Sequence, residues 1–163
     1  MINGKDAHLK NVHSVQSELL RLLSGMDYCL DWKPDPYAWS ARQVVYHVLD
    51  SPPGGIHQVL WGMISGDLDE FELWASLDNM TPTRSTYDLE QIREDIIEFF
   101  HGMEAAIEAA DEGDFDEKSI LARLRSQGVD ETRTLRMLLE GIFDRHWRQH
   151  LEHIRELREG LGM

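Results

Sequence analysis

The chain has 163 residues, and 16 Lys and Arg stand against 30 Asp and Glu, which gives a formal net charge of −14. This length fits a single core, so we expect one domain over residues 1–163. Nucleic-acid backbones and anionic lipids attract clustered positive charge, so neither a nucleic acid nor a membrane is an expected partner. One cysteine, Cys29, excludes an intrachain disulfide and a Cys-x-x-Cys site. Without a membrane-length apolar run or the hydrophobic segment of a signal peptide, a cytoplasmic protein is expected.

The first quarter of the chain predicts one helix and an irregular segment. From Leu9 onward the apolar residues recur mostly at intervals of three, four or seven, and Gly25 is a plausible end for this helix. Residues 28–39 contain Pro34 and Pro36, which exclude a regular helix there. We therefore expect a loop that its aromatic residues hold against the core.

A second helix is predicted to begin sharply at Ser40. This residue and Gln43 form a Ser-x-x-Gln capping box, which satisfies backbone N–H groups at a helix start. The Pro-Pro-Gly-Gly run at 52–55 should break or kink the helix, and a second segment should then run to about Gly66. Within residues 67–85 the pattern favours at most one short packed helix.

Two long helices are expected in the second half. Residues 85–88 match a capping box for a third helix, whose apolar stripe continues as far as Ala110. Residues 117–125 are interpreted as a short extra helix, and a final long helix is expected over about 131–159. Strand-type alternation is absent from any stretch of useful length. The predicted fold class is therefore all-α, a bundle of four principal helices with a kinked second helix.

The last predicted helix carries histidines on its core-facing line. This line consists of residues at steps of three or four: Leu135, Leu139, Ile142, His146, His150, His153 and Leu157. Side chains four residues apart stack on adjacent turns, so His146 and His150 can offer two imidazoles to one ion. His153 lies about 10 Å from His146 along the helix axis, which is far for a shared ion. A third ligand is better supplied by a neighbouring helix, with His153 behind the ligands or at the rim.

His47, at the edge of the buried face of the second helix, is the candidate third ligand. Three histidines leave an open position for water or substrate, which is typical of a catalytic rather than a structural metal site. The alternative is that these histidines are core residues that hydrogen-bond to a carboxylate or a carbonyl. The remaining histidines are expected at the surface or at helix edges: His8, His13, His57 and His101.

The chain resembles the DinB/YfiT-like superfamily in two short motifs. Trp39-Ser40-x6-His47, followed by Val-Leu-Asp-Ser, is similar to the second helix of that superfamily. His146-Trp-Arg-Gln-His150-Leu-x-x-Ile154 is similar to its fourth helix. Helix order and length agree over essentially the whole chain, although the Pro-Pro-Gly-Gly break and residues 115–128 depart from the pattern.

The resemblance implies an up-down-down-up four-helix bundle that is commonly a homodimer. By position, the metal ligands would be His47, His146 and His150, and the ion would be nickel, zinc or a similar divalent metal. Several relatives are thiol-dependent transferases or isomerases, so a small-molecule thiol is the substrate that the resemblance implies.

Two other functions stay open beside a metal-dependent enzyme. The chain can be a non-catalytic dimeric binding module whose histidines are structural or sensory, or its histidines can form a pH switch. In the enzyme hypothesis, Asp50 and Asp144 are candidates to orient imidazole N–H groups or solvent, with plain surface acidity as the alternative.

Overall fold

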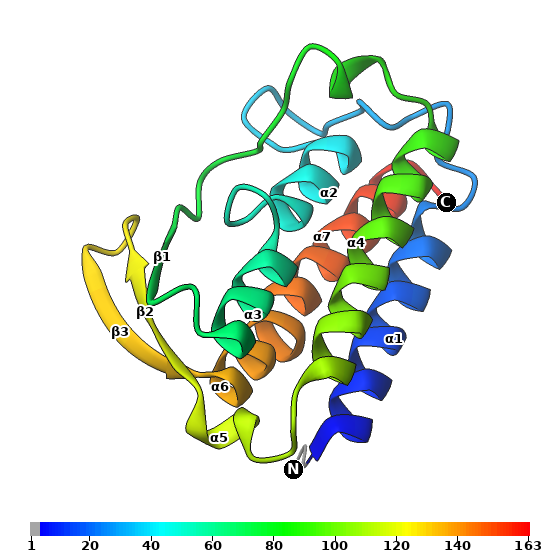
Figure 1. Cartoon of the computed structure of the whole chain (residues 1–163). Helices are drawn as coiled ribbons and strands as arrows, with labels where there is room; N and C mark the ends of the chain where they lie inside the picture. The colour runs from blue at the N-terminus through cyan, green and yellow to red at the C-terminus, as the bar shows by residue number, and fades with distance from the viewer. Residues whose placement is uncertain (1–3) are drawn as a thin grey trace.

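A computed structural model describes residues 4–163, and the start of the chain before Gly4 lies outside the described residues. The molecule is a four-helix bundle with a small sheet on one side (Figure 1). The principal helices are α1 (Gly4–Leu23), α2 and α3 (Ala41–Leu49 and Ile56–Ser65), α4 (Leu89–Ala109) and a C-terminal helix made of α6 (Leu135–Leu139), η2 (Glu140–His146) and α7 (Trp147–Gly160). In Figure 1, α1 ascends, α2–α3 and α4 descend, and the C-terminal helix ascends. The predicted fold class and its up-down-down-up order are confirmed.

The bundle core follows the predicted apolar stripes. Helix α1 packs on α4 and α7, α3 packs on α4, and α2 packs on α7. Every residue of the expected stripe of α4 is buried: Ile92, Ile96, Phe99, Met103, Ala106 and Ala110. Within residues 4–163, no helix combines the length and apolarity needed to cross a membrane.

The starts of α2 and α4 show how local sequence fixes helix ends. The Ser40 hydroxyl accepts from the backbone N–H of Gln43, and the Gln43 side chain accepts from the Ser40 N–H, so the predicted capping box is confirmed. Helix α4 also has a capping box, but it is formed by Asp88 and Gln91 rather than by Ser85. The N-cap therefore lies three residues later than the sequence analysis placed it, and the helix begins at Leu89.

The predicted break in the second helix is also confirmed. Helix α2 ends at Leu49, and α3 begins at Ile56 after the Pro-Pro-Gly-Gly run. Gly54 and Gly55 have φ angles of 90° and 88°, a region that favours glycine, and they turn the chain between the two helices.

The three-stranded sheet contradicts the all-helical interpretation of two segments. Strands β1 (Glu70–Leu73) and β2 (Ser119–Leu124) pair in parallel, and β2 pairs antiparallel with β3 (Val129–Thr134). The helices expected within 67–85 and 117–125 are therefore wrong, and the final helix begins at Leu135, not near 131. Along β2 only Ile120, Ala122 and Leu124 are buried in alternation, which is too short a pattern to recognise without its partner strands. The other short elements are η1 (Arg84–Thr86) and α5 (Asp114–Glu117).

The C-terminal helix is not α-helical throughout, because η2 is a π-helical segment. The wider π turn shifts the helical phase, so the fully buried line passes through Phe143 and Trp147 rather than through Ile142 and His146. His146 is the last residue of η2 and is half-buried. The seven-residue inward line predicted from a uniform α-helix is therefore wrong in its middle part. His146, at the end of this segment, faces His47 of α2.

Candidate metal centre

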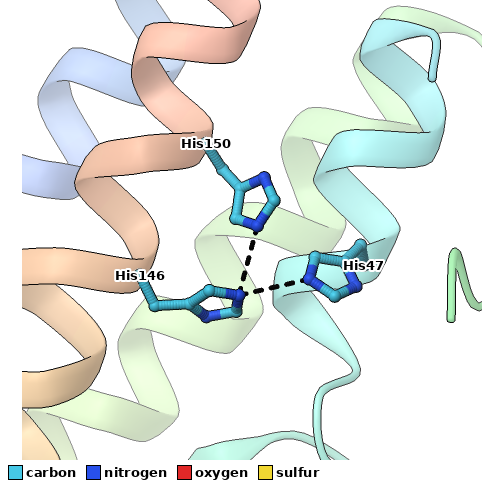
Figure 2. Close-up of side chains that lie close together, drawn as sticks. All are labelled: His47, His146 and His150. Atoms are coloured by element: carbon cyan, nitrogen blue, oxygen red, sulfur yellow. Dashed lines mark hydrogen bonds between the residues drawn. The ribbon is translucent and has the colours of Figure 1, made fainter. Parts of the chain in front are cut away.

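Three histidines from two helices converge at one point between α2 and the C-terminal helix (Figure 2). The Nε2 atom of His146 lies 3.2 Å from Nε2 of His47 and 3.1 Å from Nε2 of His150. The three ligand atoms all lie within 4.8 Å of one another. The structure thus brings together His47, which is distant in sequence, and the His146–His150 pair.

The orientation of the His47 ring is fixed by a backbone carbonyl. Nδ1 of His47 lies 2.6 Å from the carbonyl oxygen of Leu77, which can only accept, so this nitrogen carries the proton. In a neutral imidazole the other nitrogen, Nε2, then presents its lone pair to the histidine cluster. Metal-binding histidines commonly donate their second ring N–H in this way.

The segment that supplies the carbonyl is itself held in place. Asn79 has a left-handed φ of 57°, and its side-chain amide donates to the carbonyl oxygens of Tyr46 and His47. Arg84 donates to the carbonyl oxygen of Asn79. These bonds tie the loop after β1 to the end of α2, so the Leu77 carbonyl has a defined position over His47.

Burial keeps the three imidazoles neutral. Desolvation, opposed in part by the bond to Leu77, lowers the pKa of His47 below its ordinary value. Desolvation and the charge of His47 lower the pKa of His146 to about 4. For His150, desolvation and the charges of the neighbouring histidines lower the pKa to about 3. At neutral pH the rings therefore keep the unprotonated nitrogens that metal coordination requires.

An indole ring lies beside the cluster. The Trp39 ring centroid lies 4.8 Å from that of His47 and 6.4 Å from that of His150, where the two rings are stacked. Nδ1 of His150 is buried without a hydrogen-bond partner. The apolar surroundings lower the local polarity and strengthen electrostatic interactions with any bound ion.

This arrangement fits a divalent metal. Two nitrogen ligands about 2.0 to 2.1 Å from a tetrahedral ion are roughly 3.3 Å apart, close to the two shorter distances between the Nε2 atoms. Among residues 4–163, these histidines form the one group of three or more histidine, cysteine or acidic side chains that geometry qualifies to hold an ion. Three imidazoles leave part of the coordination sphere for solvent or substrate.

The other candidate residues lie outside this group. The His153 ring centroid is 6.3 Å from that of His150, so His153 borders the cluster without joining it. Asp50 accepts from the Gly54 N–H and from Arg84, and Asp144 accepts from Asn11 at 2.6 Å. These aspartates were candidates to accept hydrogen bonds from imidazole N–H groups. For His47, the Leu77 carbonyl accepts this hydrogen bond instead. A backbone carbonyl has no sequence motif, so sequence reasoning missed it.

The remaining histidines are placed as expected with one exception. His13 and His101 are exposed, and His57 is half-buried with its ring at the edge of Phe99. His8 is 1% exposed and stacks on Phe115, with ring centroids 5.0 Å apart. Its expected surface position is wrong, because the turn after α4 folds Phe115 over the start of α1.

Solved structures with the same fold include two bacterial proteins. The chain is similar to YfiT from Bacillus subtilis, described as a probable metal-dependent hydrolase with an unusual four-helix bundle topology, with a TM-score of 0.70 and 20% identity over 97% of this chain and 87% of that one. It is also similar to a protein from Streptococcus pneumoniae, with a TM-score of 0.66 and 9% identity over 98% and 92% of the two chains. No family model and no curated protein sequence matches the chain. The chain therefore shares the four-helix bundle fold of these two structures.

Proposed function

We propose that this protein is a metal-dependent enzyme that binds one divalent ion through His47, His146 and His150. One observation supports the proposal above the others: three neutral imidazoles direct Nε2 atoms toward a common point, and the Leu77 carbonyl fixes one of them. Within the described chain, the hydrogen-bond partners of these rings are that carbonyl and one another. Among the described residues, His146 and His150 thus have no carboxylate or carbonyl partner of the kind that a purely structural buried histidine normally has.

A bound divalent ion would supply Lewis acidity and would lower the pKa of a water or thiol that reaches it. The chain itself contributes position and environment. His47 is oriented by Leu77, and Trp39 shields one side of the cluster from solvent. This environment favours reactions in which a nucleophile must lose its proton near neutral pH.

The finer proposal is a thiol-dependent transferase or isomerase that uses zinc or nickel. Imidazole ligands suit both ions, so the donor set is compatible with either. A hydrolase is the alternative reaction, because the similar Bacillus subtilis protein is described as a probable metal-dependent hydrolase. The two reactions differ in the nucleophile, a thiol or a water.

Elemental analysis of tag-free protein tests the metal site. We expect close to one divalent ion per chain in the wild type and a loss of most of it in His47→Ala and His150→Ala. His13→Ala is the matched control, because His13 is exposed and lies outside the cluster. Metal that survives His47→Ala but not His150→Ala would show a different third ligand, with His153 the next candidate.

A wild type that stays metal-free after incubation with zinc and nickel would contradict the enzyme proposal. The chain would then be better explained as a non-catalytic helical binding module. We also propose that the chain forms a homodimer, which sedimentation equilibrium would measure directly.

A further inference from the structure

A cavity lies directly beside the histidine cluster, between the sheet and the C-terminal helix. Its volume is about 360 Å³, within the range of small-molecule sites. His47 and His146 line one side, and Leu73 and Trp74 contribute apolar surface at the end of β1. A molecule in this cavity would therefore touch the proposed metal ligands.

The charged residues in the wall of this cavity, apart from the histidines, are all positive. They are Arg133 at the end of β3 and Arg145 in η2, and no aspartate or glutamate belongs to the described lining. The chain carries 30 acidic residues and a net charge of −14, so a wall free of carboxylates is unlike the rest of its composition. The local charge favours an anionic occupant.

The two guanidinium groups converge over one glycine. A Cβ atom placed on Gly141 would lie 3.0 Å from Nη2 of Arg145 and 3.8 Å from Nη1 of Arg133. A side chain at Gly141 would therefore displace at least the end of Arg145. Because residue 141 is glycine, no side chain occupies the space beside the two guanidiniums at the edge of the cavity.

The two arginines differ in their existing partners. Arg133 donates through Nε and Nη2 to Glu131, which leaves Nη1 directed toward Gly141. Arg145 has no hydrogen bond and no ion pair with any residue of the described chain, 4–163. The two arginines and Glu131 together therefore carry a net charge of +1.

Other carboxylates are present near the arginines but outside the cavity. Glu140 and Asp144, together with Glu131, line a neighbouring depression that the two arginines also border. Asp144 already accepts a hydrogen bond from Asn11. Neither Glu140 nor Asp144 belongs to the described lining of the cavity beside His146.

We propose that this cavity binds a small molecule through a carboxylate, held by Arg145 and by Nη1 of Arg133, so that its reacting end lies at the histidine cluster. A planar guanidinium edge matches a carboxylate, and one excess positive charge matches one carboxylate better than a dianion. Only the placement of the reacting end at the histidine cluster rests on the proposed function. The carboxylate site itself is defined by residues that are not metal ligands.

Cobalt-loaded protein provides the first test, because its visible absorption changes when a thiol reaches the ion. Two probes of similar size are compared: 3-mercaptopropionate, which carries a carboxylate, and 2-mercaptoethanol, which is neutral. We expect the wild type to bind the anionic thiol about tenfold more tightly, an advantage that Arg145→Gln removes while affinity for the neutral thiol stays unchanged. Arg93→Gln is the charge-matched control on α4, and it should keep the preference.

A second test uses metal-free protein, so that failure of the metal site leaves the carboxylate site testable. Butyrate, which carries a single carboxylate, is titrated against ¹⁵N-labelled protein, and we expect saturable shifts of the Gly141 amide that Arg145→Gln abolishes and Arg93→Gln does not. If cobalt does not bind but butyrate does, the proposed function fails and this inference stands. Equal affinities for the two thiols, equal losses in the two variants, or tighter binding of inorganic phosphate than of butyrate would each overturn the inference.

Discussion

Tyr46 and His47 are neighbours in α2, yet they belong to two polar clusters of different character. The Tyr46 hydroxyl donates to Asp95 at 2.6 Å, and the Arg84 guanidinium lies 4.7 Å from the Tyr46 ring centroid. Arg84 also forms an ion pair with Asp50 at 3.1 Å. In this first cluster the Tyr46 hydroxyl donates to a carboxylate and the Arg84 guanidinium faces the Asp50 carboxylate, so donors meet acceptors.

The cluster around His47 lacks this complementarity. Its nitrogens face nitrogens: His146 Nε2 lies close to both His47 and His150, and a single neutral ring nitrogen cannot serve as both donor and acceptor. The comparison separates a polar cluster that stabilises the fold from one that suits an added cation. Removal of the Tyr46 hydroxyl from the first cluster should alter stability alone, whereas changes to the second should alter metal binding and its dependence on pH.

The largest expected effect is stabilisation by metal. Zinc at a free concentration a thousandfold above its Kd should raise the free energy of unfolding by about 4 kcal/mol, because the unfolded chain lacks the assembled site. Chemical denaturation with and without zinc measures this difference. His150→Ala should lose most of it, and Tyr46→Phe should keep it. An equal zinc effect in His150→Ala would contradict the assignment of this residue.

The loss of stability of the metal-free protein in acid should be nearly as large as the stabilisation by zinc. The pKa values of about 4 for His146 and about 3 for His150 lie below the ordinary value of 6.5, so the unfolded chain binds more protons in acid. Stability is therefore complete above pH 6.5 and is lost as the pH falls. Between pH 7 and pH 5 we expect a loss of roughly 3 kcal/mol, from about 1.4 kcal/mol per proton and pH unit.

Urea denaturation at several pH values measures this loss in chelator-treated protein. His146→Leu removes one of the two strongly shifted groups and should reduce the loss substantially. A pH profile that is the same in the wild type and in this variant would show that the cluster does not govern acid stability.

The smallest expected effect on stability comes from a change in the first cluster, around Tyr46. Tyr46→Phe removes the hydroxyl that donates to Asp95 and should cost about 1 kcal/mol of the free energy of unfolding. Metal content and the pH profile below pH 6.5 should not change, because Tyr46 is not a member of the histidine cluster. A loss of metal in Tyr46→Phe would show that the two clusters are coupled through α2.

Much of the bundle could be predicted from the sequence because its determinants are local. The cap at Ser40, the break at 52–55 and the stripe of α4 depend on residues close to one another in the chain. The histidine pair in the last helix was recognisable for the same reason, since four-residue spacing is a local pattern. His47 could be chosen as its partner, and the structure brings it within 3.2 Å of His146.

Features that depend on distant partners were missed. Strand β2 pairs with β1, some 50 residues earlier in the chain (Glu70 with Leu121), and six residues of β2 alone do not show that partner. The π segment at Glu140–His146 has no apolar spacing that distinguishes it in sequence from an α-helix. Burial of His8 likewise depends on Phe115, which lies far along the chain.

The sequence by itself determined the principal helices, the cap at Ser40, the break at 52–55 and the types of side chain available for chemistry, because these depend on spacing along the chain. Only the tertiary structure decided how the candidate site is completed. It placed the Leu77 carbonyl on His47, brought His146 to His47 and set Arg133 of β3 in the wall of the adjoining cavity. These contacts join residues that are distant in sequence, and the balance of packing and hydrogen bonding that selects them exists only in the folded chain.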